Sequence, residues 1–357
     1  MNMAKKVIAV LFGGQSSEHD VSKVSAANII SHINQDKYTV LPVYITKEGH
    51  WLLYDGPVEN IQNDTWEKYA TEAILSPDAT HRGIFRIVGE KVKLMPVDLV
   101  FPVLHGANGE DGTIQGLFEL AKIPYVGCGV LSSAVSMNKA FTKIIVEKLG
   151  IDQAKNTVVY RNEIENDIES CIEKVEDVCG YPCFVKPACA GSSVGITKAH
   201  NRDELVDGLW TASKEDRTVV IEENITGYEL ECAVLGNTDV KASAVGQVLA
   251  AAEFYDYDAK YNNKESKTVI PAPIPENKTE EIREKAVKIF KALDGRGLSR
   301  VDFFMEEGTE RIVFNEINTL PGFTPISMYT MLFNEVGLST EEIIDKIIDL
   351  GFSRNED

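Results

Sequence analysis

The stretch Val7-Ile8-Ala9-Val10-Leu11-Phe12-Gly13-Gly14 is an apolar run ended by two glycines, which predicts a buried strand followed by a tight turn. Further strands are predicted at Tyr38–Ile45 and at residues 99–104, and the latter ends at His105-Gly106. Between the first two strands, apolar residues are spaced for one face of a helix: Val21, Val24, Ala27, Ile30 and Ile33. This alternation predicts an open parallel α/β domain, in which ligands bind at the carboxyl ends of the strands.

The composition is that of a globular protein with an acidic charge balance. Hydrophobic residues make up 44% of the chain and charged residues 25%, which supplies a sizeable core and excludes general disorder. The 36 lysines and arginines against 55 aspartates and glutamates give a formal net charge of −19. Such a charge argues against a nucleic-acid or anionic-membrane partner. No apolar run approaches the roughly 18 residues of a membrane-spanning helix.

The six cysteines point to a reducing compartment. None forms a C-x-x-C pair, and no spacing of cysteine and histidine matches a zinc site. The N-terminal residues also lack the apolar core of a secretory signal. We therefore expect free thiols and a cytoplasmic location.

The length of 357 residues predicts two or three domains, at about 100–200 residues per domain. After the first α/β segment, a helix is predicted around Asn138–Leu149, followed by strands at Cys183–Lys186 and Val219–Glu222. Between that helix and the first of these strands, a single charged helix is predicted, with these apolar residues on one side: Ile164, Ile168, Ile172 and Val175. The domains expected are an N-terminal α/β domain at 1–135, a central domain at 136–226 and a C-terminal domain at 227–357.

The C-terminal domain contains the strongest local pattern. After a strand at Tyr228–Leu235, two strands are predicted at Arg300–Met305 and Arg311–Asn318, and their short connection predicts an antiparallel hairpin. Side chains of a strand alternate between two faces, so Phe314, Glu316 and Asn318 are expected to share one face.

A metal site is expected on this hairpin. If the polar faces coincide, Asp302, Glu316 and Asn318 meet at one end, and three oxygen donors suit Mg²⁺ completed by phosphate and water. Simple solvated carboxylates are the alternative. Because these polar side chains stand in strands otherwise rich in Val, Ile and Phe, a metal site is favoured over solvated carboxylates.

A phosphate-binding loop is expected after the strand that ends at Lys186. Gly191-Ser192-Ser193-Val194-Gly195 follows it, and glycines let the backbone approach a phosphate while hydroxyl and N–H groups coordinate its oxygens. The order of a Walker A loop is absent. An ordinary turn is the alternative, and Lys139 is a similar lysine that could equally be a surface residue.

Two side chains at strand ends of the first domain suggest a small-molecule site. Glu18 follows the Gly13-Gly14 turn, where a carboxylate either begins a helix or receives the ammonium group of a ligand. His105 ends another strand and precedes Gly109-Glu110-Asp111-Gly112, which favours a ligand site over a structural histidine.

Taken together, these residues resemble those of the D-alanine–D-alanine ligases of the ATP-grasp superfamily. The resemblance extends over nearly the whole chain and rests on six segments in order: residues 12–22, 105–112, 191–195, 254–261, 300–302 and 315–324. It implies a three-domain ATP-grasp architecture and the ligation of two D-alanine molecules through a D-alanyl phosphate, for peptidoglycan precursors.

The resemblance also implies a role for each matching residue. Contacts to ATP would come from Lys139, Lys186, Ser193, Glu222, Glu223, Ile225 and Glu229. Mg²⁺, as two ions and with Mn²⁺ as a substitute, would be held by Asp302, Glu316 and Asn318. The D-alanine substrates would meet Glu18, His105, Lys260 and Ser327. Ser192 and Tyr261 would close the mobile loop over Glu18, and Arg300 with the Gly322 N–H would stabilise the tetrahedral intermediate.

The chemistry explains these residue types. A carboxylate becomes reactive toward an amine only after phosphorylation, and both steps gather negative charge that preorganised cations must stabilise. Water must be excluded from the acyl phosphate, so the polar stretch Tyr255–Lys267 is expected to be a lid. By resemblance, we also expect a homodimer.

Two alternatives stay open. A relative that uses D-serine or D-lactate as second substrate is the nearest one; lactate ligases typically have histidine where this chain has Tyr261, and serine-specific relatives often have a basic residue where it has Met328. A non-catalytic nucleotide-binding protein is the other, and the presence of Arg300 and of every expected metal ligand argues against it.

Overall fold

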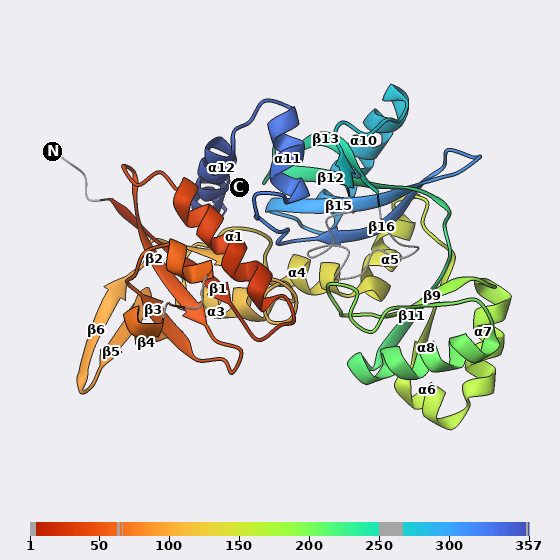
Figure 1. Cartoon of the computed structure of the whole chain (residues 1–357), viewed down its shortest axis with the longest axis horizontal. Helices are drawn as coiled ribbons and strands as arrows, with labels where there is room; N and C mark the ends of the chain where they lie inside the picture. The colour runs from red at the N-terminus through yellow and green to blue at the C-terminus, as the bar shows by residue number, and fades with distance from the viewer. Residues whose placement is uncertain (1–4, 63–64, 66, 250–266, 355, 357) are drawn as a thin grey trace.

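The computed structural model describes residues 5–62, 65, 67–249, 267–354 and 356. These residues form three β-sheets with helices around them (Figure 1). Each sheet lies within one of the three ranges expected for the domains. The boundaries at 135 and 226 stay predictions.

The first sheet has the strand order β6-β5-β4-β3-β2-β1-β7. Its parallel part consists of β1 (Lys6–Gly13), β2 (Tyr38–Ile45) and β7 (Leu99–Val103). The sheet is therefore parallel where the sequence predicts it, and an antiparallel meander extends it: β3 (Trp51–Tyr54), β4 (Ala70–Leu75), β5 (Gly83–Val88) and β6 (Lys91–Pro96). The helical segments of this part are α1 (His19–His32), α2 (Glu59–Gln62), a 3-10 turn at Glu67–Tyr69, and α3 (Thr113–Ala121).

The second sheet has the order β10-β9-β11-β8 and is antiparallel throughout. Its strands are β8 (Asn156–Tyr160), β9 (Cys183–Pro187), β10 (Thr197–Ala199) and β11 (Thr218–Glu223). The helices before and around it are α4 (Val130–Met137), α5 (Lys139–Lys148), α6 (Arg161–Asn166), α7 (Ile168–Val178) and α8 (Arg202–Glu215).

The expectation of one helix from Ile164 to Val175 is wrong. The segment is divided into α6 and α7 at Asp167, whose side chain accepts a hydrogen bond from the backbone N–H of Ser170. An aspartate that caps a helix in this way competes with continuation of the preceding helix. The apolar side chains still face one core.

The third sheet has the order β14-β13-β12-β15-β16 and is antiparallel. Its strands are β12 (Gly227–Gly236), β13 (Lys241–Leu249), β14 (Lys267–Val269), β15 (Gly297–Glu306) and β16 (Ile312–Asn318). Helices α10 (Glu276–Ala292), α11 (Met328–Glu335) and α12 (Thr340–Ser353) complete this part. The apolar face of α10 packs in the core of the sheet, with Ile289 and Phe290 fully buried, and burial of each such side chain contributes about 1.5–3 kcal/mol.

The first and third sheets share a hydrophobic core through α1, α11 and α12. Ile344 and Ile348 of α12 belong to the same cluster of buried residues as Ile8 and Phe101 of the first sheet. In Figure 1, α1 and α12 lie between the first and third sheets, and the second sheet stands apart at the other end of the molecule. The loops at the ends of β1, β7 and β16 are therefore brought together.

The predicted hairpin of β15 and β16 is confirmed, but its register contains an irregularity. Asp302 pairs with Glu316 and Phe303 pairs with Phe314, so Asn315 is an extra residue on β16. Because such a bulge reverses the alternation of side chains, Phe314 packs in the core while Glu316 lies on the face of Asp302. The expectation that Phe314 shares a face with Glu316 is wrong.

Candidate active site

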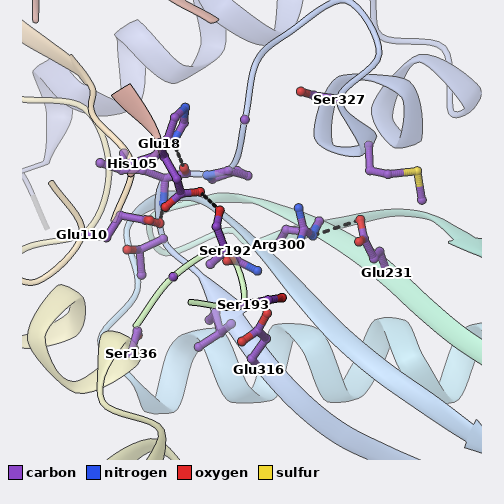
Figure 2. A pocket seen from close by; sticks show the side chains of 18 of the residues that line it. Glu18, His105, Glu110, Ser136, Ser192, Ser193, Glu231, Arg300, Glu316 and Ser327 are labelled. Carbon is purple, nitrogen blue, oxygen red and sulfur yellow. Dashed lines mark hydrogen bonds and ion pairs between the residues drawn. The ribbon is translucent and has the colours of Figure 1, made fainter. Parts of the chain in front are cut away.

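Glu18 lies at a junction of three chain segments. It is the N-cap residue of α1, and its side chain is buried. Ser192 from the glycine-serine loop (residues 191–195) donates a hydrogen bond of 2.5 Å to its Oε1 (Figure 2). A Cβ atom at Gly106 or at Gly191 would lie 2.8 Å from Glu18 Oε2. Only glycine permits both backbones to approach the carboxylate this closely.

His105 follows β7 and is buried beside Glu18 (Figure 2). Its Nδ1 lies 2.9 Å from the backbone oxygen of Leu320, in the loop after β16, and its Nε2 lies 3.4 Å from Ser25 Oγ. Burial lowers the pKa of His105, although the Glu18 carboxylate acts in the opposite direction. A neutral ring that donates from Nδ1 to the Leu320 carbonyl fits these contacts.

Glu110 is a second carboxyl group of this junction, half-buried, which the sequence did not point to. Its Oε2 accepts the N–H of Gly106 at 2.8 Å, and its Oε1 accepts the N–H of Leu320 at 3.0 Å. Burial and then the nearby Glu18 raise the pKa of Glu110 to about 8. The segment Gly109–Gly112 carried a sequence signal, but nothing in the pattern indicated that Glu110 would reach the loop after β16.

Arg300 lies between two buried carboxylates. Its Nε and Nη2 donate to Asp302 Oδ1 and Oδ2 at 2.8 and 2.7 Å, and its Nε lies 3.0 Å from Glu231 Oε2 (Figure 2). Burial alone would lower the pKa of Arg300, but Asp302 and Glu231 raise it well above its usual value. Glu231 was missed in the sequence analysis, because an isolated glutamate within a predicted strand gives no signal of its partner.

The three expected metal ligands lie together on the hairpin of β15 and β16. Glu316 and Asn318 line a cavity, whereas Asp302 is buried and accepts a hydrogen bond of 3.1 Å from Asn318 Nδ2 besides those from Arg300. In the described part of the chain, no cluster of three or more histidine, cysteine, aspartate or glutamate side chains could hold a metal. Two carboxylates and an amide oxygen nevertheless fit the oxygen-donor chemistry of Mg²⁺.

Two adjoining cavities contain most of the expected residues. The smaller, of about 180 Å³, is lined by Glu18, His105, Ser192, Arg300, Asn318, Gly322 and Ser327. The larger, of about 400 Å³, is lined by Lys186, Glu222, Glu223, Ile225 and Glu229. Four residues line both cavities: Lys139, Ser193, Ile196 and Glu316.

Glu222 and Lys186 line the larger cavity and belong to a buried ion-pair cluster. Glu222 Oε1 lies 2.8 Å from Lys143 Nζ, and Glu222 Oε2 accepts a hydrogen bond of 2.7 Å from Lys186 Nζ. Burial alone would raise the pKa of Glu222, but Lys143 and Lys186 lower it to about 2. Lys143 was missed in the sequence analysis because its α5 position resembled an ordinary lysine of a helix.

Two further residues that are expected to contact ATP, Glu223 and Lys139, have other partners in the structure. Glu223 accepts the backbone N–H of Lys155 at 2.9 Å. Lys139 Nζ donates to the Ala190 carbonyl at 2.8 Å and lies 3.8 Å from Glu316 Oε2. The lysine therefore connects the glycine-serine loop to the β15–β16 hairpin.

The glycine-serine loop has a constrained backbone. Ser192 and Ser193 have φ angles of +48° and +61°, in the left-handed region that non-glycine residues rarely adopt. Non-glycine residues in this region cost about 1–3 kcal/mol each and persist where the surroundings impose them. This geometry directs Ser192 to Glu18 and places Ser193 between the two cavities.

Ser327 and Gly322 lie at the far side of the smaller cavity. Ser327 Oγ accepts the N–H of Thr324 at 2.9 Å, and a Cβ on Gly322 would lie 3.0 Å from that same oxygen. Lys260, Tyr261 and nearly all of the expected lid lie outside the described residues. Their roles stay predictions.

Two family models match the chain. The model described as D-ala D-ala ligase N-terminus matches residues 7–128, and the model described as D-ala D-ala ligase C-terminus matches residues 145–349. A D-alanine–D-alanine ligase of Ruminiclostridium cellulolyticum is 53% identical, over 99% of this chain and 97% of the relative. The enzyme of the same name from Acetivibrio thermocellus is 52% identical over the same shares.

Solved structures are similar over the whole chain as well. The VanG D-Ala:D-Ser ligase from Enterococcus faecalis matches with a TM-score of 0.89 and 42% identity, over 98% of this chain and 100% of that one. The D-alanine-D-alanine ligase from Coxiella burnetii matches with a TM-score of 0.84 and 32% identity, over 99% and 95% of the two chains.

Proposed function

The chain belongs to the D-alanine–D-alanine ligase family, whose members have the ATP-grasp fold, and we propose how its own residues carry out the ATP-dependent ligation of two D-alanine molecules. The observation that carries the proposal is the wall shared by the two cavities, where Lys139, Ser193 and Glu316 line both. The terminal phosphate of ATP in the larger cavity would there meet the carboxylate of D-alanine in the smaller one.

The first D-alanine is held by Glu18 in this proposal. A buried carboxylate that accepts a hydrogen bond from Ser192 is suited to receive the substrate ammonium group. The ammonium is thereby fixed at one end of the smaller cavity, and the substrate carboxylate is directed toward the wall shared with the larger one. His105 borders the same cavity, and its ring is neutral because burial lowers its pKa.

ATP occupies the larger cavity. Its volume of about 400 Å³ falls within the range of small-molecule sites. Lys139 and Lys186 supply positive charge for the phosphates, together with Ser193 of the glycine-serine loop. Glu222, Glu223 and Ile225 border the adenine and Glu229 the ribose.

Mg²⁺ would be held by Glu316, Asn318 and Asp302, as two ions, with Mn²⁺ as a substitute. The ions would neutralise phosphate charge while the nucleotide is bound. Because both oxygens of Asp302 accept hydrogen bonds from Arg300, we expect Asp302 to give up one of them when it binds metal. Arg300 would still be held by Glu231.

Arg300 and the N–H of Gly322 stabilise the tetrahedral intermediate. Both line the smaller cavity from different elements, β15 and the loop after β16. In our proposal the carboxylate of the second D-alanine is bound by Ser327 and by Lys260, and Tyr261 closes the site with Ser192 and Glu18.

The second substrate is D-alanine in this proposal. The similarity to a D-Ala:D-Ser ligase gives D-serine a specific observation in its favour, and the apolar Met328 beside Ser327 favours D-alanine. Purified enzyme, supplied with ATP, Mg²⁺ and equimolar D-alanine, D-serine and D-lactate, is expected to form mainly D-alanyl-D-alanine, measured by mass spectrometry of the products. Predominance of D-alanyl-D-serine or of the depsipeptide would contradict it.

A cytoplasmic homodimer completes the proposal. None of the helices in the described part of the chain has the length and apolar character needed to span a bilayer. Leu120 of α3, Leu131 of α4 and Phe141 of α5 are 60–66% exposed, and in this proposal such apolar side chains contact a second copy of the chain. Sedimentation of the purified protein at twice the monomer mass would support the dimer, and a monomer at micromolar concentration would contradict it.

A further inference from the structure

The loop after β16 is held by side chains from the N-terminal part of the chain. The N–H of Leu320 donates to Glu110 Oε1 at 3.0 Å, and the Leu320 carbonyl oxygen lies 2.9 Å from His105 Nδ1. The N–H of Phe323 donates to Ser25 Oγ at 3.2 Å, and the Phe323 carbonyl accepts from Asn28 Nδ2 at 2.7 Å. Both polar backbone groups of both residues therefore have a side-chain partner that is more than 200 positions away in the sequence. We call Ser25, Asn28, His105 and Glu110 the brace.

Half of the brace is one face of helix α1. Ser22, Ser25 and Asn28 follow one another at intervals of three residues, so they lie along one side of the helix. Ser22 accepts the N–H of Gly13 at 2.8 Å and donates to the carbonyl of Val103, which fixes α1 to β1 and β7. The same helix carries Glu18 at its N-cap. The ammonium receptor and half of the brace are thus parts of one rigid element.

The other half of the brace follows β7 and is connected to the first half. Ser25 Oγ lies 3.4 Å from His105 Nε2, so a hydroxyl that accepts from Phe323 can donate to the ring while the ring donates to Leu320. Glu110 reaches Leu320 with one oxygen and the N–H of Gly106 with the other. Gly106 is one of the two glycines whose backbones lie against Glu18. Glu110 therefore spans from the wall of the ammonium site to the loop after β16.

Between the two held residues lie Pro321 and Gly322. Proline has no N–H, and none of the four contacts of the brace uses the N–H of Gly322. Pro321 and Gly322 both line the smaller cavity, next to Leu320 and Arg300. The brace thus fixes the residues on both sides of one N–H donor at the wall of the site.

From this geometry we infer that Ser25, Asn28, His105 and Glu110 are positioning residues, which hold the Gly322 N–H at a fixed distance from Glu18 so that the donor meets the oxyanion of the tetrahedral intermediate. The inference rests on the proposed function, since it takes the role of Gly322 from there. A misplacement of reacting groups by about 1 Å can reduce a rate about 10²-fold. The brace would therefore affect the rate of reaction rather than the binding of ATP.

Asn28→Asp is the most direct test. The substitution keeps the shape of the side chain but places an oxygen against the Phe323 carbonyl, which repels it. We expect kcat for D-alanyl-D-alanine synthesis to fall about 10- to 100-fold, with an unchanged KM for ATP. A phosphinate dipeptide analogue, whose tetrahedral centre mimics the intermediate, is expected to lose affinity by a similar factor. Asn162→Asp, the same change on the exposed surface of α6, is the matched control and should match wild type.

The outcomes separate the brace from a purely structural role. A folded Asn28→Asp variant with kcat within twofold of wild type would overturn the inference, and so would parallel losses in kcat and in ATP affinity. If Asn28→Asp does not fold, Asn28→Ala is tested in its place, because it removes the donor without adding repulsion. Its kcat is expected to fall by a smaller factor, again with an unchanged KM for ATP. Unchanged kcat in Asn28→Ala would then overturn the inference. A wild-type enzyme that forms no dipeptide would instead contradict the proposed function itself.

Discussion

Two buried ion-pair clusters, one at each cavity, have the same construction with opposite sign. In the first, Lys143 and Lys186 enclose Glu222, so the three groups leave one formal positive charge. In the second, Glu231 and Asp302 enclose Arg300, so the three groups leave one formal negative charge. All six side chains are at least four-fifths buried.

The difference in sign matches the difference in ligand. The positive cluster borders the larger cavity, where phosphates are proposed to bind, and the negative cluster includes Asp302, one of the ligands proposed for Mg²⁺. An isolated buried charge costs several kcal/mol, whereas a charge enclosed by partners remains ionised. Each cluster thus offers one unit of charge to its ligand, and both depend on the central residue.

Removal of the centre of the positive cluster is expected to have the largest effect. Glu222→Gln leaves Lys143 and Lys186 buried without their shared counter-ion, which should lower the free energy of unfolding by about 3–5 kcal/mol. Adding Lys143→Met removes one of the two opposed cations, so the double variant should be more stable than Glu222→Gln alone. Urea unfolding at pH 7 measures both. A double variant less stable than the single one would show that the cluster is not held by charge.

The same variant gives a defined pH dependence. The pKa of Glu222 is lowered from 4.5 to about 2 in the folded protein. Its contribution to stability is therefore present above pH 4.5 and is lost as the pH falls through about 2. The difference in unfolding free energy between wild type and Glu222→Gln should stay constant from about pH 8 to 5 and narrow only at lower pH. A narrowing that starts near pH 7 would contradict the lowered pKa.

Removal of the centre of the negative cluster should abolish most of the activity. Arg300→Met eliminates a donor to the developing oxyanion, which typically costs about 2.7–4 kcal/mol or 10²–10³ in kcat. It also leaves Glu231 and Asp302 directly opposite each other on β12 and β15, which adds repulsion. Arg283→Met, on α10 and outside the lining of both cavities, is the control. An Arg300→Met variant with more than a tenth of wild-type kcat would rule out this role.

Glu316 lines both cavities and is expected to be a ligand of the metal. Glu316→Gln keeps the size of the side chain but removes a charged oxygen ligand, so we expect dipeptide synthesis to fall more than about 10-fold and the Mg²⁺ concentration for half-maximal rate to rise. Glu335→Gln, at the exposed end of α11, should leave both values unchanged. A folded Glu316→Gln variant with wild-type Mg²⁺ dependence would exclude Glu316 as a ligand.

The smallest effect is expected where the glycine-serine loop meets Glu18. Ser192→Ala removes one hydrogen bond to a buried carboxylate, worth about 1.5–3 kcal/mol, or roughly a 10- to 100-fold effect. We expect the lower end of that range, together with more than one ATP hydrolysed per dipeptide, because water reaches the acyl phosphate. Ser170→Ala on the exposed end of α7 should keep the ratio at one. A ratio of one ATP hydrolysed per dipeptide in Ser192→Ala would show that Ser192 does not help to exclude water from the acyl phosphate.

The parts of the fold that follow simple periodicity could be predicted from the sequence. The first strand and Gly13-Gly14 turn, the hairpin of β15 and β16, and helices α1 and α5 were predicted from the sequence pattern. The antiparallel extension of the first sheet was not predicted, because its strands are short and partly exposed. The bulge at Asn315 and the break at Asp167 each depend on one residue, and no period-based argument resolves a single-residue change.

The candidate site could be predicted where a charged residue stands near the end of a predicted strand or just after it, as do Glu18, Lys186 and Glu316. The partners that hold them could not, because Glu231 and Lys143 look like ordinary members of a strand and a helix. The polar stripe of Ser22, Ser25 and Asn28 was a missed signal, since these residues repeat every three positions along one helix. Only the folded chain shows that Ser25 and Asn28 of this stripe contact Phe323.

The central claim is that the D-alanine carboxylate is phosphorylated before the second amine attacks it. D-alanine labelled with ¹⁸O in both carboxylate oxygens tests this claim most directly with the wild-type enzyme, ATP and Mg²⁺. Attack of the carboxylate on the terminal phosphorus forms one C–O–P bridge, and attack of the amine then breaks the C–O bond, so phosphate leaves with one oxygen from D-alanine. We predict one ¹⁸O atom in each phosphate released with a dipeptide, measured by mass spectrometry. Unlabelled phosphate accompanying dipeptide formation would contradict the account.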